Sequence, residues 1–418
     1  MNIRKLKIGF VICILMVSIF SMSMTAATPP PLFDEGMGTE SDPYMIKNLD
    51  QLQGMEQNLS AHYALANDID ASATVGWNGG AGFQPIGTYS WSYPQWSFTG
   101  VLDGRNYTIS GLYINRPSSD YVGLFGSMGP QAKVTNLSLV STSITGDAYV
   151  GGLVGFNNQG FISNTHSAGN VSGDDRIGGL VGQNNGGTVE YSSSTAWVSG
   201  VYRVGGLVGK NNVNSVISHS HAGGVVTGTQ SYHGGLAGRS IGANTVIEHS
   251  FATGTVNGYI YVGGLVGSHY SGSVVETHSS GDVNGHYVIG GLIGWNGGSV
   301  SSSSSSGVVV CTTDHAGGLI GENRNAVTDS QATGNVSGRD YVGGLVGYNY
   351  DGSTVCTSHA TGTVSGSREL IGGLVGRNEG SISTSFSTGD VSGVSYVGGL
   401  TGYMETDGIS RILTHRGP

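Results

Sequence analysis

Apolar residues recur along the chain at an almost constant spacing. Each copy of the pattern is marked by a leucine that follows glycine, as in "GGLVG", "GGLIG" and "GGLAG". The marker leucines lie 26 to 29 residues apart, over ten intervals, and are Leu124, Leu153, Leu180, Leu207, Leu236, Leu265, Leu292, Leu319, Leu345, Leu374 and Leu400. A constant period of this length indicates an array of stacked units, either a solenoid or a propeller.

The residue types inside one unit favour strands over helices. Gly, Ser, Val and Thr dominate each unit, and none of them is a strong helix former. In the copy from Tyr341 to Gly366, turn residues separate three short runs, "VGGLVG", "SHATG" and "TVSG". A four-stranded propeller blade needs about 40 residues, which is more than one unit contains. The pattern therefore predicts an all-β protein, a parallel β-helix of about 10–11 coils, one for each marker leucine.

Alternation within the second and third runs predicts which side chains face inward. Small residues or Val occupy every second position, as in Thr165, Ser167 and Val171, or Ser358, Ala360 and Val364. The position between the first two of these varies in size and polarity: His166, Phe251, His278, Gln331, His359 and Phe386. Because alternate side chains of a strand point to opposite faces, we expect the small set to face the core and the variable set to face solvent.

Two other rows of equivalent residues are expected from stacking. If each coil turns sharply at the same place, the repeated glycines are expected to supply the special backbone conformation of those corners. Asparagine recurs four residues after most marker leucines: Asn157, Asn184, Asn211, Asn296, Asn323, Asn349 and Asn378. Stacked amides can hydrogen-bond along the solenoid axis, so this row predicts a structural ladder.

The segments outside the repeats predict a leader, a cap and a tail. Residues 1–27 combine basic residues, an apolar run and small residues, which is typical of a secretory signal peptide; an uncleaved anchor is the alternative. Residues 28–119 do not repeat, and Asn48 with Gln51 predicts a capping box that opens a short helix over the first coil. Residues 120–402 are the predicted β-helix. For residues 403–418, either the natural chain continues beyond them or they fold over the last coil.

Charge and cysteine content exclude two classes of interaction. The formal net charge is −10, and after Lys7 the lysines are Lys47, Lys133 and Lys210, so no basic stripe exists to follow a phosphate backbone. Nucleic acid is therefore not an expected partner. Cys311 and Cys356 fall at different positions of their repeats, and we expect no disulfide between them.

The repeated cores resemble those of the GLUG-repeat family, which is named for a Gly-Leu-x-Gly core. The segment from "GTESDPYMIKNLDQL" to "FTGVLDGRNYTISGLYI" also resembles the region that often precedes such repeats in secreted prokaryotic proteins. The resemblance implies a right-handed β-helix in an extracellular or cell-surface protein, sometimes attached to adhesive regions or to immunoglobulin-cleaving metalloproteases. It supplies no activity, and this chain lacks the "HExxH" of zinc proteases.

No group of residues in the sequence predicts catalysis, a metal or a cofactor. Asp68 and Asp70 share a strand face, but at a strand end they are expected to make turn hydrogen bonds. Asp174 and Asp175 are expected at an exposed turn. The histidines of the variable row, His166, His278 and His359, are several coils apart and cannot share a metal ion.

One outward row is the candidate binding face. Four residues before the marker leucines stand Tyr149, Arg176, Arg203, Tyr232, Tyr261, Tyr341 and Tyr396, with Val288, His315 and Leu370 as interruptions. Exposed aromatic rings and arginines are favoured at binding surfaces, so the row predicts contact with a glycan or an extracellular protein. Stacking of these side chains on one another, solely to stabilise the coils, is the alternative.

Together these features suggest a secreted or cell-surface, monomeric, adhesion-type module without enzymatic activity. One alternative is a carbohydrate-active β-helix enzyme, a polysaccharide lyase or hydrolase, which would need neighbouring carboxylates on one face. The other is a structural spacer that holds a further C-terminal domain.

Overall fold

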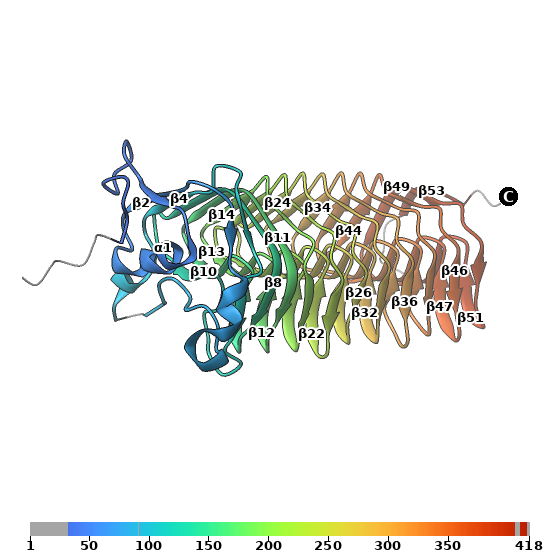
Figure 1. Ribbon diagram of the computed structural model, residues 1–418. Coiled ribbons are helices and arrows are strands. Elements are labelled where there is room, and N and C mark those ends of the chain that lie inside the picture. Colours follow the sequence, from blue (N-terminus) through green and yellow to red (C-terminus); the bar gives the residue numbers. More distant parts are fainter. Residues whose placement is uncertain (1–31, 91, 406–409, 416–418) are drawn as a thin grey trace, which may run out of the picture. The chain divides into compact units, whose positions relative to one another are not determined.

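The computed structural model describes residues 32–418 except 91, 406–409 and 416–418. Residues from Phe33 onward form one compact unit, a parallel β-solenoid, as predicted from the repeat period (Figure 1). All pairings between its named strands are parallel, and each strand pairs with the equivalent strand of the neighbouring coil. The predicted signal peptide lies outside the described residues.

The strands form three sheets, here called sheets A, B and C. Sheet B contains β7 (Phe125–Met128), β10 (Val154–Asn158), β13 (Val181–Asn185), β18 (Val208–Asn212), β23 (Ala237–Ser240), β28 (Val266–His269), β33 (Ile293–Asn296), β38 (Ile320–Asn323), β43 (Val346–Asn349), β48 (Val375–Asn378) and β52 (Thr401–Met404). Sheet C contains β9 (Ala148–Gly151), β12 (Asp175–Gly178), β17 (Tyr202–Gly205), β22 (Ser231–Gly234), β27 (Ile260–Gly263), β32 (Tyr287–Gly290), β37 (Ala316–Gly317), β42 (Val342–Gly343), β47 (Glu369–Gly372) and β51 (Ser395–Gly398).

Sheet A holds the remaining strands of every coil and those of the N-terminal region. Its members are β1 (Tyr44–Ile46), β2 (His62–Leu65), β3 (Ile69–Asp70), β4 (Val101–Asp103), β5 (Thr108–Ser110), β6 (Tyr113–Asn115), β8 (Lys133–Thr145), β11 (Phe161–Ser172), β14 (Thr188–Glu190), β15 (Ser193–Ser194), β16 (Trp197–Gly200), β19 (Val216–Ser218), β20 (His221–Ala222), β21 (Val226–Gly228), β24 (Val246–Glu248), β25 (Phe251–Ala252), β26 (Val256–Asn257), β29 (Ser273–Val275), β30 (His278–Ser279), β31 (Val283–Gly285), β34 (Ser299–Ser301), β35 (Ser304–Ser305), β36 (Val309–Cys311), β39 (Ala326–Thr328), β40 (Gln331–Ala332), β41 (Val336–Gly338), β44 (Thr354–Cys356), β45 (His359–Ala360), β46 (Val364–Gly366), β49 (Ser381–Ser387), β50 (Val391–Ser392) and β53 (Ser410–His415).

A single coil contains more strands than the three runs predicted. In the coil of Leu345, the "VGGLVG" run divides into β42 in sheet C and β43 in sheet B, with the marker leucine at the corner between them. The other two runs are β45 and β46, as expected. The sequence analysis missed β44, which follows the turn after Asn349.

The marker leucines stack in register. From Leu153 to Leu374, each leucine donates its backbone N–H to the carbonyl of the leucine in the following coil, with N to O distances of 2.8 to 3.0 Å. Their side chains are fully buried, whereas Leu400 in the last such coil is partly buried. The residues predicted to face inward, such as Ser167, Ala360 and Val171, are buried, and those of the variable row are half-buried or exposed.

The reason for the glycine repeats differs from the expected one. The glycines of the "GGLxG" cores do not have positive φ angles. They are needed because the backbone of the same or the next coil lies against them: an added Cβ on Gly343 would overlap the carbonyl oxygen of Val346, and one on Gly344 would overlap that of Gly373. Close packing of backbones, and not a special corner conformation, therefore fixes these glycines.

The left-handed backbone conformation is instead adopted by residues with side chains. One column with positive φ follows sheet C and includes Tyr121, Tyr149, Arg176 and their equivalents through Tyr396. A second column follows sheet A from Asn136 and Asn164 to Thr384. This conformation costs about 1 kcal/mol or more for a residue other than glycine, so the stacked coils must hold these positions in place.

The asparagine row forms the predicted ladder. Asn157 donates from Nδ2 to Oδ1 of Asn184 at 2.9 Å, and the same bond joins Asn323 to Asn349 at 2.8 Å. The ladder is interrupted where Ser240 and His269 replace asparagine. There, Nδ2 of the preceding Asn211 has no hydrogen-bond partner, and neither do Oγ of Ser240 or the two ring nitrogens of His269.

The N-terminal region continues the solenoid. Helix α1 (Leu49–Gly54) begins after Asn48, whose side chain accepts a hydrogen bond from the Gln51 amide at 2.9 Å, as the capping box predicted. Its buried Leu52 belongs to the same apolar cluster as the coil leucines. Three 3-10 segments follow, η1 (Met55–Gln57), η2 (Ser72–Gly80) and η3 (Pro94–Trp96). Pairing of β2 with β4, and of β4 with β8, joins this region to sheet A.

Part of the C-terminal tail also belongs to the solenoid. The backbone of β53 pairs in parallel with β49 of the preceding coil. Within the described part of the chain, no helix is both long enough and apolar enough to cross a membrane.

Candidate functional site

The candidate binding residues form one continuous column along sheet C. The strand pairs on either side of them are in register, for example Ile177 with Val204 and Gly178 with Gly205. All seven adopt the left-handed conformation, with φ from 51° to 75°: Tyr149, Arg176, Arg203, Tyr232, Tyr261, Tyr341 and Tyr396. Six are half-buried, and Tyr396 is exposed.

Neighbouring members of the column contact one another, as expected if these side chains stack to stabilise the coils. The rings of Tyr121 and Tyr149 stack with centroids 4.7 Å apart, and the Arg176 guanidinium lies 4.4 Å from the centroid of the Tyr149 ring. Tyr232 and Tyr261 stack at 5.3 Å. The column therefore contributes to packing between coils, at about 0.5–1.5 kcal/mol for each aromatic pair.

A second column, in sheet B, lies beside the first and was missed in the sequence analysis. It comprises the residues three after each marker leucine from Leu153 onward: Phe156, Gln183, Lys210, Arg239, Ser268, Trp295, Glu322, Tyr348, Arg377 and Tyr403. Contacts join the two columns: the Arg239 guanidinium is 5.0 Å from the Tyr232 ring centroid, and the rings of Tyr341 and Tyr348 are 5.8 Å apart. We call the two columns together the aromatic–arginine face.

One stretch of this face is rich in cations. Both Arg176 and Arg203 bind the carboxylate of Asp175, and Arg203 does so through two bonds of 2.6 Å. Asp175, expected at an exposed turn, is therefore largely covered by these arginines. Lys210 and Arg239 occupy paired positions in neighbouring coils. Burial, together with the nearby guanidiniums, lowers the pKa of Lys210 to about 8.

A groove of about 220 Å³ opens in the middle of the face. Its lining residues come from four successive coils and are Tyr232, Arg239, Tyr261, Ser268, Tyr270, Trp295 and Arg324. Tyr270 and Trp295 stack at 5.5 Å, and the Arg239 guanidinium lies between the Tyr232 ring and the Tyr270 ring, 5.9 Å from the centroid of the latter. The groove is thus lined by two pairs of stacked rings, Tyr232 with Tyr261 and Tyr270 with Trp295, with a guanidinium in its first coil, Arg239, and another in its last coil, Arg324.

A buried acid–base pair lies beside the groove. His315 Nδ1 is 2.6 Å from Glu322 Oε1, and both side chains are less than one-tenth exposed. The other carboxylate oxygen of Glu322 is 3.8 Å from Arg324. Burial, aided by the negative charge of Glu322, raises the pKa of Tyr287 and of Tyr350 to about 12. Glu322 is therefore engaged by protein groups and does not project as a free carboxylate.

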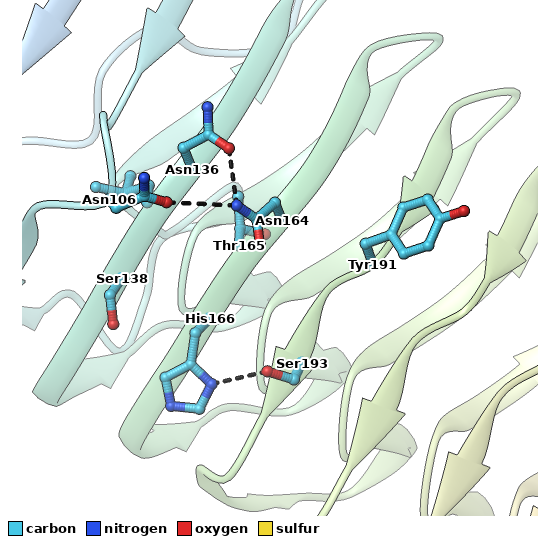
Figure 2. A pocket seen from close by; sticks show the side chains of 9 residues that line it. Asn106, Asn136, Ser138, Asn164, Thr165, His166, Tyr191 and Ser193 are labelled. Atoms are coloured by element: carbon cyan, nitrogen blue, oxygen red, sulfur yellow. Dashed lines mark hydrogen bonds between the residues drawn. The ribbon is translucent and has the colours of Figure 1, made fainter.

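A second hollow of about 200 Å³ lies on sheet A, away from this face, and its lining is polar (Figure 2). Asn164 donates from Nδ2 to Asn136 Oδ1 at 2.8 Å, and His166 is bonded to Ser193 Oγ at 2.9 Å. These polar groups bond to one another, and the hollow has fewer groups directed at a ligand than the groove.

The other residues considered from sequence have structural roles. Asp70 accepts a hydrogen bond from the Ser72 amide at 2.9 Å, as expected for a turn carboxylate, whereas Asp68 accepts one at 2.8 Å from the Thr108 amide of the neighbouring strand β5 and not from a turn. In the described ranges, no three His, Cys, Asp or Glu side chains are grouped so that they could hold a metal ion.

Comparison with known proteins finds a family motif in three of the coils. The model of the GLUG motif matches residues 173–199, 338–365 and 367–392. The chain is 41% identical over 140 residues to halomucin of Haloquadratum walsbyi, a match that covers 32% of this chain and 2% of halomucin. It is 36% identical over 158 residues to a protein of Evansella cellulosilytica described as a Gly-rich membrane protein, covering 37% of this chain and 18% of the relative. Both matches thus span a small part of these longer relatives.

A solved structure was also found in the comparison. A Bacteroides ovatus chain described as an immunoglobulin A1 protease aligns with a TM-score of 0.47 and 20% identity, over 67% of this chain and 80% of that one. In the sequence comparison, three coils match the GLUG motif that the Gly-Leu cores predicted, which is consistent with the GLUG-repeat family.

Proposed function

We propose that this chain is a non-enzymatic cell-surface module whose aromatic–arginine face binds a glycan. The observation that carries the proposal is the groove, in which stacked tyrosine and tryptophan rings lie open on a rigid, repetitive surface. Flat aromatic rings offer large contact areas at a low entropic cost, which suits them to sugar rings. The names of two relatives, halomucin and a Gly-rich membrane protein, support a location at the cell surface.

Backbone strain also supports a role for these side chains beyond packing. Glycine would occupy the left-handed positions at a lower cost, yet the column carries tyrosine and arginine there. Strained backbone positions are enriched at functional sites, and here they carry side chains that are half-buried or, at Tyr396, exposed. The stacking between coils offsets part of this strain, and we attribute the retention of tyrosine and arginine at these positions to ligand binding.

A glycan array tests the proposal. A variant with Tyr232, Tyr261 and Tyr341 changed to Ser is expected to lose binding at least tenfold, because the flat surfaces are removed. The control changes three aromatic residues outside the face, Tyr107, Tyr191 and Phe251, which are at least one-third exposed. Circular dichroism melting of both variants checks that the solenoid remains folded. Unchanged binding in the first variant would exclude this face.

A second candidate function follows from the His315–Glu322 pair beside the groove. A carbohydrate-active enzyme needs an acid and a base near the bound sugar, and His315 with Glu322 would supply them once a bound sugar displaced the protein contacts of Glu322. If the module is such an enzyme, it releases reducing ends from the bound glycan, and Glu322→Gln abolishes the release while binding persists. Absence of release from every glycan that binds on the array excludes this alternative.

A further inference from the structure

Arg239 is a cation without a carboxylate partner. The arginines at 176, 203, 339, 368 and 377 each bond to a carboxylate, and Arg324 lies near one. Among the described residues no carboxylate is within ion-pair distance of Arg239, and its Nε is buried without a hydrogen-bond partner. The Tyr232 and Tyr270 rings contact the guanidinium by cation–π interactions, which engage its flat face and not its N–H groups.

The surroundings of Arg239 increase the positive charge. Lys210 pairs with it in the neighbouring coil, and no carboxylate of the described chain binds Lys210. Arg203 lies in the same coil as Lys210, and Arg176 lies in the coil before it, with Asp175 bound to both arginines. Four cations thus face one carboxylate over a short stretch of a chain whose formal net charge is −10. An anion placed here would gain from charges that the protein itself leaves uncompensated.

The aromatic part of the groove restricts the class of anion. Tyr232 stacks on Tyr261, and Tyr270 stacks on Trp295, so two pairs of rings lie next to the cations along the solenoid axis. A mineral anion or a single phosphate would use none of this apolar surface. A chain of sugar rings uses both features, because its rings can lie on the aromatic surfaces while its acidic groups reach the cations.

We infer that the groove binds an acidic polysaccharide, with the carboxylates of uronic acid residues bound by Arg239 and Lys210 and the sugar rings packed on the tyrosine and tryptophan rings. This inference rests on the proposed function and names the class of glycan. A carboxylate matches the planar fork of an arginine through two parallel hydrogen bonds, which favours uronate over a sulfate ester. The chain would run across successive coils, about 4.8 Å apart, from Lys210 toward Arg324.

Isothermal titration of the full chain with polygalacturonate and with its fully methyl-esterified form tests the inference. Esterification removes the charge but keeps the sugar backbone, so we expect affinity for the ester to be at least tenfold lower. Arg239→Gln is expected to weaken binding of polygalacturonate tenfold or more and to leave binding of the ester unchanged. The matched control is Arg105→Gln, which removes the same charge from an exposed position outside the face. Added salt should weaken binding of the acid but not of the ester.

The possible results separate this inference from the proposed function. Equal affinity for acid and ester, or equal effects of Arg239→Gln and Arg105→Gln, would overturn the inference, while binding that depends on the tyrosines would leave the proposed function standing. Tighter binding of dextran sulfate than of polygalacturonate would also overturn it, since the site would then select sulfate. If neither form of the polymer binds, the inference is wrong, and the glycan array alone decides the proposed function.

Discussion

The asparagine ladder gives a sharp test of what holds the coils together, because two of its members differ in their bonding. Asn323 donates from Nδ2 to Asn349 Oδ1 at 2.8 Å and to the Asn325 carbonyl at 2.7 Å, and it accepts from Asn296 Nδ2 at 2.8 Å. Asn211 accepts one bond, from Asn184 Nδ2 at 3.1 Å, and its own Nδ2 has no partner. Both side chains are fully buried.

The magnitudes follow from the groups that each substitution leaves unpaired. Asn323→Ala leaves the buried Nδ2 of Asn296 without a partner, at about 1–3 kcal/mol, whereas the Asn325 carbonyl still accepts from the Thr354 amide at 3.1 Å, so we expect a loss of about 2 kcal/mol. Asn211→Ala leaves Asn184 Nδ2 still bonded to the Gly187 carbonyl at 2.9 Å. It also removes an unpaired buried amide, so the expected loss is about 1 kcal/mol or less.

Hydrogen exchange is the appropriate assay, since each coil of a solenoid contacts mainly its neighbours and a local loss of stability stays local. With tenfold for each 1.4 kcal/mol, protection of the amides in β38 and β43 should fall about 30-fold in the Asn323→Ala variant. Protection in β18 of the Asn211→Ala variant should fall about fivefold at most. Both substitutions leave a cavity of the same size. Equal losses in the two variants would show that the cavity, and not the hydrogen bonds, determines the cost, and the ladder argument would be wrong.

Two further predictions concern the core glycines and the buried histidines. Gly317→Ala should lower the thermal midpoint, because the new Cβ would overlap the Ile320 carbonyl and prevent normal packing. Gly76→Ala should leave the thermal midpoint nearly unchanged, because nothing lies within 4 Å of its new Cβ. Equal melting curves for the two variants would refute the close-packing argument. Burial lowers the pKa of His233 and of His269 from 6.5 to about 4. Between these pH values the unfolded chain binds protons that the folded chain does not bind. The free energy of unfolding should therefore be retained above about pH 6.5 and fall as the pH decreases toward 4. Denaturant midpoints of the double variant His233→Val, His269→Asn should depend less on pH in this window, and an unchanged slope would contradict the assignment.

The fold was predictable because stacking makes every coil repeat the same constraints. The marker leucines and the small inward residues could be identified from spacing and alternation, and the asparagine ladder from one recurrent position. The role of the glycines could not be inferred, because a close approach between backbones and a left-handed turn both require glycine and so give the same repeated residue in the sequence. Residues such as Val288 and Leu370, which adopt that turn here, carry no propensity for it.

Of the two columns that form the candidate site, only the one along sheet C could be predicted from the sequence. The sheet C column stood out through its tyrosines, whereas the sheet B column varies from Gln183 to Trp295 and shows no common residue type. Its signal is the variation itself: three residues after each marker leucine, the side chain changes in size and charge from one coil to the next. Which cations lack partners also depends on contacts between coils, as the binding of Arg203 to Asp175 shows, and no spacing rule contains that information.

Stacking also determines where this molecule can acquire specificity. An inward residue meets its equivalents above and below, so a change there disturbs three coils, as the unpaired groups around His269 illustrate. An outward residue of the aromatic–arginine face has its backbone fixed by the same stacking, but its side chain is free to differ from one coil to the next. Because the groove takes its lining from four coils, a single substitution such as Ser268→Arg would alter the ligand preference without altering the coil. Recognition by such a surface is therefore encoded in the order of side chains along the two columns, and exchange of whole coils should move the binding site along the solenoid.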